Sequence, residues 1–386
     1  MNPKVSIITR TRERALLLRR AVESVVQQSF DDWELVVIND GGPREEVANV
    51  LRDYRRRNGQ KIRLLHNEGS GGMEAATNLG IASSAGDYIA IHDDDDSWDK
   101  GFLATTVGWL EEHSRSSVWG GVITHCMKVA ERVQEGQLTE VYREPYNHWI
   151  ESVSLFRMAG ANIFPPISFV YRRRVLDEVG LYREDLPVMG DWEFNLRFLR
   201  KYEIAVIPRL LAHYHQRVGR TRGSYAGSVT AARGRHRRTE SRIRNDLLRE
   251  DVEQGAWGLG FLAHLSQNTI ESDWRPVEKA VSAEMRRDLQ QIARRGKRIA
   301  VFGASISGRS WVRWLKRHFA HLEIVCFFDN DDRKWHKTVD GIMVRPPWAI
   351  TERKFDTILV ASSGHDEIAA QLEDSGLREH HDFHLL

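Results

Sequence analysis

Four consecutive aspartates, Asp93 to Asp96, directly follow the apolar run from Tyr88 to His92. Carboxylates this close repel one another and resist removal from water, so solvent, helix N–H groups or a cation must offset the repulsion. Oxygen-only ligands of this kind suit Mg²⁺ or Mn²⁺ held jointly with a substrate phosphate. The alternative is an acidic turn that faces water, as charge runs usually do. A divalent-cation site and a solvated turn both fit the run taken alone.

The elements before the aspartates alternate between strand and helix patterns, which is typical of a parallel sheet covered by helices. The carboxyl ends of parallel strands meet at one edge, where the ligand crevices of open α/β sheets lie. Asp40 follows the second expected strand and Asp93 the fourth, so we expect both at that edge. The expected strands cover residues 5–9, 35–38, 62–66 and 88–92, and the expected helices cover 15–28, 45–57 and 73–82.

Length and composition limit the class of protein. A chain of 386 residues suggests two or three domains, and 56 Lys+Arg against 54 Asp+Glu argue against a nucleic-acid binder. Cys126 and Cys326 lie 200 residues apart, which favours neither a disulfide framework nor a zinc site. We find no secretory apolar segment at the N-terminus and no apolar stretch of roughly 18–20 residues, so we expect a cytoplasmic protein.

The rest of the chain predicts a less regular region, a basic stretch and a second α/β pattern. Helices are expected at 173–179 and 191–201, and arginines such as Arg244 fill the basic stretch. The second pattern has strands at 299–302, 324–328 and 357–361 and helices reaching 318 and covering 367–375. The expected domains are residues 1–217, a basic, mainly helical linker at 218–296, and a smaller domain at 297–386.

Several segments resemble, in order and at the right spacing, family 2 glycosyltransferases of the GT-A fold. The resemblance spans roughly residues 4–217. It implies a nucleotide-sugar-binding domain with a mixed, mainly parallel sheet, and an inverting, metal-dependent transfer to a hydroxyl acceptor. The donor would be a nucleotide-diphosphate sugar, with a UDP-sugar favoured, and the product a surface polysaccharide or glycoconjugate. The matching segments are Val5–Ile8 with Thr11 and Arg14, Glu34–Gly41, Gly72–Gly80, Gly86–Trp98, Phe169–Gly180, Asp191–Arg197 and the region of Tyr214.

The resemblance assigns donor and metal residues. Asp40 would contact the base or ribose, with Thr11 in the loop under the base and Asn78 also at the donor. Asp93 and Asp95 would be the acids of a DxD motif that binds Mn²⁺ or Mg²⁺, with Asp93 also at the donor. Of the other two aspartates, we expect Asp96 to be an outer neighbour of the metal or a cap of the next helix, and Asp94 to point to solvent.

Asp191 is the candidate general base, because inverting relatives place a carboxylate of an acidic pair at this point. The Glu that usually precedes it is replaced by Gly190. An alternative is that Asp191 caps the helix that follows, with Glu193 in its first turn. The two roles are compatible, since a capping carboxylate can face a cleft.

Two departures from the family pattern concern phosphate charge. Thr77 stands where an Arg often precedes Asn78, so Arg10 or Arg12 is a candidate replacement, although a surface arginine is the common alternative. Later, His215 is a candidate metal ligand, as is His213, and Arg217 is a candidate diphosphate partner. A purely structural histidine is the alternative there.

The C-terminal segment resembles the small Rossmann-like domains appended to sugar-modifying enzymes. Gly303 and Gly308 match the outer glycines of GxGxxG, whereas Ser305 replaces the middle one. Asp329 ends the second strand, where a ribose-binding acid belongs. These three residues, Gly303, Gly308 and Asp329, form a candidate nucleotide site, and a structural or partner-binding domain is the alternative.

Partners and rival functions complete the expectations. The acceptor would be a saccharide or a lipid-linked molecule, and the arginines of the basic stretch could contact anionic headgroups at the inner face of a membrane, unless they form a solvated helix. An appended domain and an exposed linker are compatible with a homodimer. The rival functions are a non-catalytic nucleotide-sugar sensor or scaffold, and an NAD(P)-linked sugar-modifying enzyme that uses the C-terminal domain.

Overall fold

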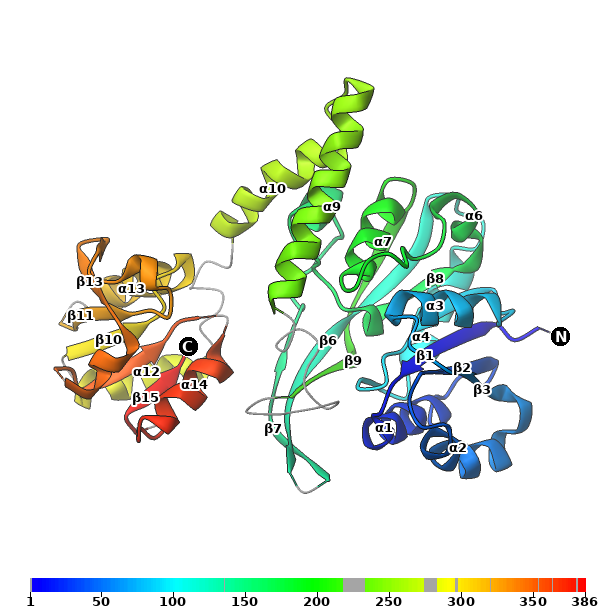
Figure 1. Ribbon diagram of the computed structural model, residues 1–386, viewed down its shortest axis with the longest axis horizontal. Helices are drawn as coiled ribbons and strands as arrows, with labels where there is room; N and C mark the ends of the chain where they lie inside the picture. The colour runs from blue at the N-terminus through cyan, green and yellow to red at the C-terminus, as the bar shows by residue number, and fades with distance from the viewer. Residues whose placement is uncertain are drawn as a thin grey trace. The chain divides into compact units, whose positions relative to one another are not determined.

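The computed structural model divides into two compact units, residues 1–267 and 268–386, each built around its own sheet (Figure 1). Parts of the expected linker, residues 218–232, 274–282 and 296–297, lie outside the described residues. Among the described residues, no helix is both long and apolar enough to span a bilayer. The structure describes residues 2–134, 136–217, 233–273, 283–295, 298–319, 321–352, 354–362, 364–379 and 381–386.

Within the described residues, the first unit contains a nine-stranded mixed sheet in the order β3-β2-β1-β4-β8-β6-β9-β5, with β7 paired to β6. The β3-β2-β1-β4 half is parallel, which confirms the expected α/β class. β6 and β9 also pair in parallel, whereas β8, β7 and β5 pair antiparallel with their neighbours. The strands are β1 Val5–Thr11, β2 Trp33–Asp40, β3 Ile62–Asn67, β4 Tyr88–Ile91, β5 Ser97–Trp98, β6 Trp119–Gln134, β7 Gln137–Pro145, β8 Phe169–Arg172 and β9 Glu203–Arg217.

Helices cover both faces of this sheet. Alternate residues of β1 enter different cores, Ile7 on the face of α1, α2 and α4, and Ile8 on the face of α3 and α7. Burial on both faces explains why β1, β2 and β4 are nearly continuous apolar runs. Figure 1 shows α1 and α2 opposite α3 and α7. The helices are α1 Ala15–Val26, α2 Arg44–Asn58, α3 Met73–Ala82, α4 Phe102–Glu112, α5 Leu155–Gly160, α6 Leu176–Val179, α7 Gly190–Leu199, α9 Arg233–Gln254 and α10 Leu259–Asp273.

The long strand β9 carries a distant part of the chain to the aspartates. It runs beside β6 and then pairs with the two-residue strand β5, so that His213 lies opposite Ser97. The residues that follow His213 therefore lie next to the loop that ends at Ser97. Sequence analysis did not delimit this strand, although it selected His215 and Arg217 near its end.

The basic helix α9 packs on the first unit through a buried arginine. The Arg244 guanidinium donates to the carbonyl oxygens of Ala159 at 3.1 Å and Gly160 at 2.7 Å, and also to that of Ala263 in α10. It lies 4.9 Å from the centroid of the Trp192 ring in α7. This part of the expected linker is therefore held against α5, α7 and α10, while Arg237, Arg238, Arg242 and Arg249 line a shallow surface groove.

Among its described residues, the second unit has a six-stranded sheet in the order β12-β13-β11-β10-β14-β15, in which all pairs are parallel except β12 with β13. The expected strand, turn and helix at 299–318 are present as β10 and α13. The strands are β10 Arg298–Phe302, β11 Glu323–Phe328, β12 Thr338–Val339, β13 Ile342–Arg345, β14 Thr357–Val360 and β15 Phe383–Leu385, and the helices are α12 Ala283–Arg295, α13 Ile306–His318 and α14 His365–Asp374.

Candidate active site

The aspartate loop joins β4 to β5 at the carboxyl edge of the first sheet. The register of β1 and β4 places Ile8 opposite Ile91, and the N–H of His92 donates to the carbonyl oxygen of Ile8 at 2.9 Å. Arg10 therefore leaves β1 beside Asp93. The fold thus brings a cation and an acid together from segments 83 residues apart.

Three of the four aspartates form a compact oxygen cluster. One carboxylate oxygen from each of Asp93, Asp95 and Asp96 lies within 4.8 Å of the others. The side chains of Asp93 and Asp95 remain 25% and 15% exposed, so a ligand can reach them, whereas Asp96 is buried. The donor set of carboxylate oxygens fits Mg²⁺ or Mn²⁺.

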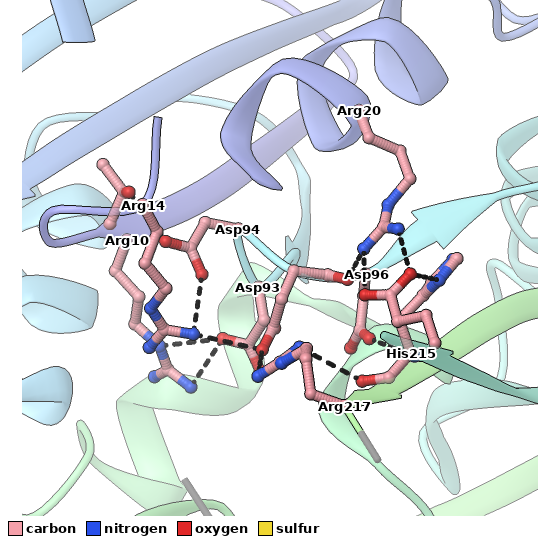
Figure 2. Close-up of polar contacts among 11 residues, drawn as sticks. Arg10, Arg14, Arg20, Asp93, Asp94, Asp96, His215 and Arg217 are labelled. Carbon is pink, nitrogen blue, oxygen red and sulfur yellow. Dashed lines mark hydrogen bonds and ion pairs between the residues drawn. The ribbon is translucent and has the colours of Figure 1, made fainter. Parts of the chain in front are cut away.

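Arginines from three elements pair with this cluster (Figure 2). The Arg10 Nη2 atom lies 2.9 Å from Asp93 Oδ1. Asp95 Oδ2 lies 3.1 Å from Arg14 Nη1 and 2.6 Å from Arg217 Nη2. Cations and carboxylates thus alternate at the sheet edge, and the same guanidinium groups have the geometry to bind phosphate oxygens.

Asp94 does not point to solvent, so that expectation was wrong. Its side chain is buried, accepts a hydrogen bond from the Thr11 hydroxyl at 2.7 Å, and lies 3.3 Å from Arg14 Nη1. The hydrogen bond from Thr11 therefore ties the aspartate loop to the end of β1. Asp96 is not a helix cap either, because α4 begins only at Phe102 and Asp96 Oδ1 accepts the backbone N–H of His215 at 2.8 Å.

Burial and charge separate the acids of the loop. Burial raises the pKa of Asp94 to about 7 and that of Asp96 well above its usual range, and repulsion from Asp95 adds to both shifts. Burial acts in the same direction on Asp95, but the cations Arg217 and Arg14 outweigh it and lower the pKa of Asp95. Asp95 is therefore held in its charged form, in contrast to Asp94 and Asp96.

His215 lies beside the cluster with both ring nitrogens engaged. Its Nε2 atom is 2.8 Å from the Ser97 hydroxyl, and its Nδ1 atom is 3.1 Å from Glu131 Oε2. Glu131 in turn pairs with Arg20 of α1, whose Nη2 atom donates to the Asp95 carbonyl oxygen. The predicted metal-ligand role of His215 stays a prediction, and in this structure the ring braces β9 against the aspartate loop.

Asp191 lies in the first turn of α7, after Met189, which adopts a left-handed conformation with φ of 65°. Since the helix starts at Gly190, Asp191 is not its N-cap residue. Asp191 Oδ2 accepts a hydrogen bond from Asn162 at 2.7 Å. Burial raises the pKa of Asp191, and the charges of Arg10 and Asp93 also act on it. A carboxylate with a raised proton affinity, close to the acid cluster, suits a general base.

A further carboxylate, Glu74 of α3, lies between Arg10 and the start of α7. Glu74 Oε2 is 3.5 Å from Arg10 Nη1, and the backbone N–H of Gly190 donates to the carboxylate. Burial raises the pKa of Glu74 to about 7, and repulsion from Asp191 contributes. Sequence analysis missed this residue.

Two predicted donor-binding residues are fully occupied by internal contacts. The carboxylate of Asp40 accepts from the side chains of Asn67 and Ser70 and from the N–H groups of Gly71 and Gly72, at 2.7 to 3.0 Å. Burial opposes ionisation, but these hydrogen bonds lower the pKa of Asp40. Asp40 therefore fixes the conformation of the loop that precedes α3.

Asn78 exchanges hydrogen bonds with the backbone of Tyr182 and donates to Glu184 at 2.8 Å. It holds the segment before α7.

Arg10, rather than Arg12, reaches Thr77. Arg10 Nη1 donates to the Thr77 hydroxyl at 2.6 Å, while Arg12 is exposed. The guanidinium thus occupies the neighbourhood where the family often has an arginine on α3. His213 is half-buried, and burial lowers its pKa.

In the second unit, the glycine-rich turn after β10 is bound by Asp329, which follows β11. Asp329 Oδ2 accepts the Ala304 N–H at 2.8 Å and lies 3.0 Å from Lys334 Nζ. A Cβ atom on Gly308 would lie 1.8 Å from the Gly303 carbonyl oxygen, so that glycine is required by packing alone. The candidate nucleotide site stays a prediction.

Glu131, Arg20 and Asn162 were also missed. None of them belongs to a motif that was recognised in the sequence, and only the folded chain brings them to the site. Glu74 did offer a signal, because it is the one acid among the residues that begin α3, and it faces Gly190, where the family resemblance implies a glutamate.

Comparisons with known proteins show what the first unit is similar to. Residues 6–180 match the family model described as glycosyl transferase family 2. The chain is 26% identical over 205 residues to the uncharacterized glycosyltransferase YwdF of Bacillus subtilis, covering 53% of this chain and 71% of that protein. It is 26% identical over 197 residues to the PGL/p-HBAD biosynthesis glycosyltransferase of Mycobacterium tuberculosis, covering 50% and 69%. Residues 6–180 are therefore similar to family 2 glycosyltransferases, and both relatives are named as glycosyltransferases.

Among solved structures, the chain resembles the mannosyltransferase PcManGT from Pyrobaculum calidifontis in complex with GDP-Man and Mn²⁺, with a TM-score of 0.48, 17% identity, and coverage of 76% of this chain and 80% of that one. It also resembles S. aureus TarS in complex with UDP-GlcNAc, with a TM-score of 0.48, 18% identity, and coverage of 64% of this chain and 66%, just under two thirds, of that one. Residues 295–382 match a second family model, described as C2185-like, N-terminal.

Proposed function

We propose that this chain is an inverting, metal-dependent glycosyltransferase that moves one sugar from a nucleotide-diphosphate sugar to a hydroxyl group of a saccharide or lipid-linked acceptor. The observation that carries the proposal is the convergence of Asp191, the Asp93–Asp95–Asp96 cluster and three arginines at one sheet edge. That edge belongs largely to the segment similar to family 2 glycosyltransferases. We expect the product to be a surface polysaccharide or glycoconjugate.

Asp93 and Asp95 would hold Mg²⁺ or Mn²⁺, because they are the two most accessible acids of the cluster. When bound, such an ion neutralises the charge that grows on the departing nucleoside diphosphate. Arg10, Arg14 and Arg217 supply further positive charge at the same place, and each now pairs with a carboxylate. Entry of a diphosphate would give these guanidinium groups a second anionic partner.

Asp191 would act as the base. It takes the proton of the acceptor hydroxyl while the acceptor oxygen forms a bond to the anomeric carbon of the donor. The bond between that carbon and the phosphate oxygen breaks, and the electron pair leaves with the nucleoside diphosphate. Attack from the opposite face inverts the anomeric carbon. Asn162 donates to the Oδ2 atom of Asp191 and so fixes the orientation of the carboxylate.

The rival functions lack such support. An NAD(P)-linked reaction would need Asp329 for the ribose, but its carboxylate already binds the Ala304 and Asp331 N–H groups and Lys334. A sensor without catalysis would have no use for a base with raised proton affinity beside the acid cluster. We therefore propose the transferase alone.

A thermal-shift screen of nucleoside diphosphates and nucleotide sugars, with and without Mn²⁺, tests the proposal. We expect at least one nucleotide sugar to raise the Tm by several degrees, and to do so more strongly with Mn²⁺. The same donor should be hydrolysed slowly without an acceptor. The proposal fails if no nucleotide sugar in the panel binds or reacts. Asp53→Asn, at an exposed carboxylate on α2, is the control for loss of surface charge.

A further inference from the structure

The space next to Gly190, where a side chain would lie, is filled by the Glu74 side chain of α3. A Cβ atom built on Gly190 would lie 2.3 Å from Glu74 Cδ, 2.4 Å from its Oε1 and 2.6 Å from its Cγ. These distances are far below van der Waals contact, so the Glu74 carboxyl lies in the space that any side chain at 190 would fill. Gly190 also donates its N–H to that carboxyl. The glycine and the glutamate are thus sterically coupled across 116 residues.

Glu74 is costly to bury and is not explained by packing. Its side chain is only 4% exposed, and Oε2 accepts no hydrogen bond from the described part of the chain. Its partner is the guanidinium of Arg10, at 3.5 Å, which also binds Asp93 and Thr77. A buried carboxylate with an unsatisfied oxygen lowers the stability of the fold. Its presence here therefore points to a role in the candidate site.

Charged and titratable groups from every neighbouring element act on Glu74. Arg10 comes from β1, Asp93 follows β4, Asp191 belongs to α7, and Tyr182 precedes α7. Arg10 is the cation of this group, and Asp191 is the proposed base. Glu74 therefore lies between the acid cluster and the base, and is coupled electrostatically to both.

We propose that Glu74 is a positioning residue of the transfer site, which supplies from α3 the acidic group that position 190 lacks. It keeps Arg10 shared between Asp93 and the start of α7, and it fixes the first turn of α7 through the Gly190 N–H. The charge of Asp191 in turn disfavours a charge on Glu74 and contributes to its raised pKa. The inference rests on the proposed transfer function.

The steric part is tested without any substrate. Gly190→Ala should lower the Tm by roughly 5 °C, because the new methyl group overlaps the Glu74 carboxyl. Combined with Glu74→Ala, the same change should cost little, since the space is then empty. A double-mutant cycle on the Tm measures this coupling. Additive effects of the two substitutions would overturn the shared-space inference.

The electrostatic part is tested by kcat/KM as a function of pH. Glu74→Gln keeps the shape and removes the charge, so we expect roughly a tenfold fall in kcat from the misplaced Arg10, and loss of the pH dependence near pH 7 that titration of Glu74 causes. The matched control is Asp53→Asn, on the exposed face of α2. An unchanged kcat and an unchanged pH profile in Glu74→Gln would overturn the proposal.

The most decisive test moves the acidic group from position 74 to position 190. Gly190→Glu alone should be nearly inactive, because two carboxyl groups compete for one space. Glu74→Ala with Gly190→Glu should recover at least about a tenth of the wild-type kcat/KM, well above Glu74→Ala alone. No recovery in a folded double variant contradicts the proposal. If the wild-type protein transfers no sugar, the proposed function fails, and the Tm cycle still decides whether residues 74 and 190 share one space.

Discussion

Both units carry aspartates just after parallel strands of the sheet, but they use these acids differently. In the second unit, Asp329 meets the Ala304 N–H and Lys334, and its charge is satisfied within the turn. In the first unit, Asp93 to Asp96 meet one another, and arginines reach them from β1, the β1–α1 loop and β9. A strand-end aspartate alone therefore does not indicate a ligand, whereas a surplus of carboxylates that recruits distant cations does.

The largest expected effect is a loss of kcat on substitution of Asp191 in the first unit, with no comparable loss on substitution of Asp329 in the second unit. Asp191→Asn should lower kcat by about 10²–10⁴, because the amide cannot accept the acceptor proton. Donor binding, followed by thermal shift, should persist. Asp329→Asn in the second unit should leave kcat within about threefold, on the scale of ordinary surface changes. Full turnover by Asp191→Asn would remove the base assignment.

The next effect concerns the fold of the second unit. Gly308→Ala places a methyl group against the Gly303 carbonyl oxygen and should destabilise that unit by about 2–3 kcal/mol. Chemical unfolding should show the loss, while transfer at low temperature is retained. A parallel loss of transfer would mean that the second unit supports the active site, and the contrast between the regions would disappear.

Asp329→Ala should have a smaller effect, about 1–3 kcal/mol, since it leaves the Ala304 N–H without its acceptor and Lys334 without its partner. Unfolding with and without NAD⁺ distinguishes the two roles of this acid. A structural acid predicts the same loss in both conditions. Stabilisation of the wild-type protein by NAD⁺ that the variant lacks would restore the nucleotide-site interpretation.

The last effect, which is the smallest when taken per pH unit, is a pH dependence of stability that arises at Glu74. Its pKa is raised in the fold from 4.5 to about 7, so the folded state binds the extra proton between these values. Stability should therefore fall as pH rises through this window, by at most about 1.4 kcal/mol per unit. Glu74→Gln should flatten the Tm profile there. An identical profile in the variant would show that Glu74 does not titrate in this range.

The elements of the first half could be predicted because their apolar periodicity and strand-end acids are local signals. Asp93 follows a strand and was selected partly for that reason, whereas Asp95, Asp191 and Arg217 were selected through the family resemblance; contacts and charge effects link all four in the structure. Asp94 was misjudged, since its burial depends on Thr11 and Arg14, which approach from a different strand and loop. Packing between side chains of distant segments cannot be predicted from the spacing of residues along the sequence.

Contacts between distant segments could not be derived from spacing either. The role of β9 follows from its two-residue pairing with β5, which is too short to leave a periodic pattern. Glu74 and Gly190 are separated by 116 positions and are related only by the angle at which α3 approaches α7. The departure at Gly190 was visible, but its compensating residue was not.

Arg244 has a practical consequence for where the chain can be shortened. Its guanidinium satisfies the carbonyl oxygens of Ala159 and Gly160 and covers the Trp192 ring, one residue from the proposed base. A truncation after Arg217, at the end of the motif-bearing segment, would expose that ring and leave both carbonyls to water. A truncation after Asp273 keeps α9 and α10. A fragment that keeps these contacts and the candidate site therefore extends to Asp273, 56 residues beyond the last recognisable motif residue, Arg217.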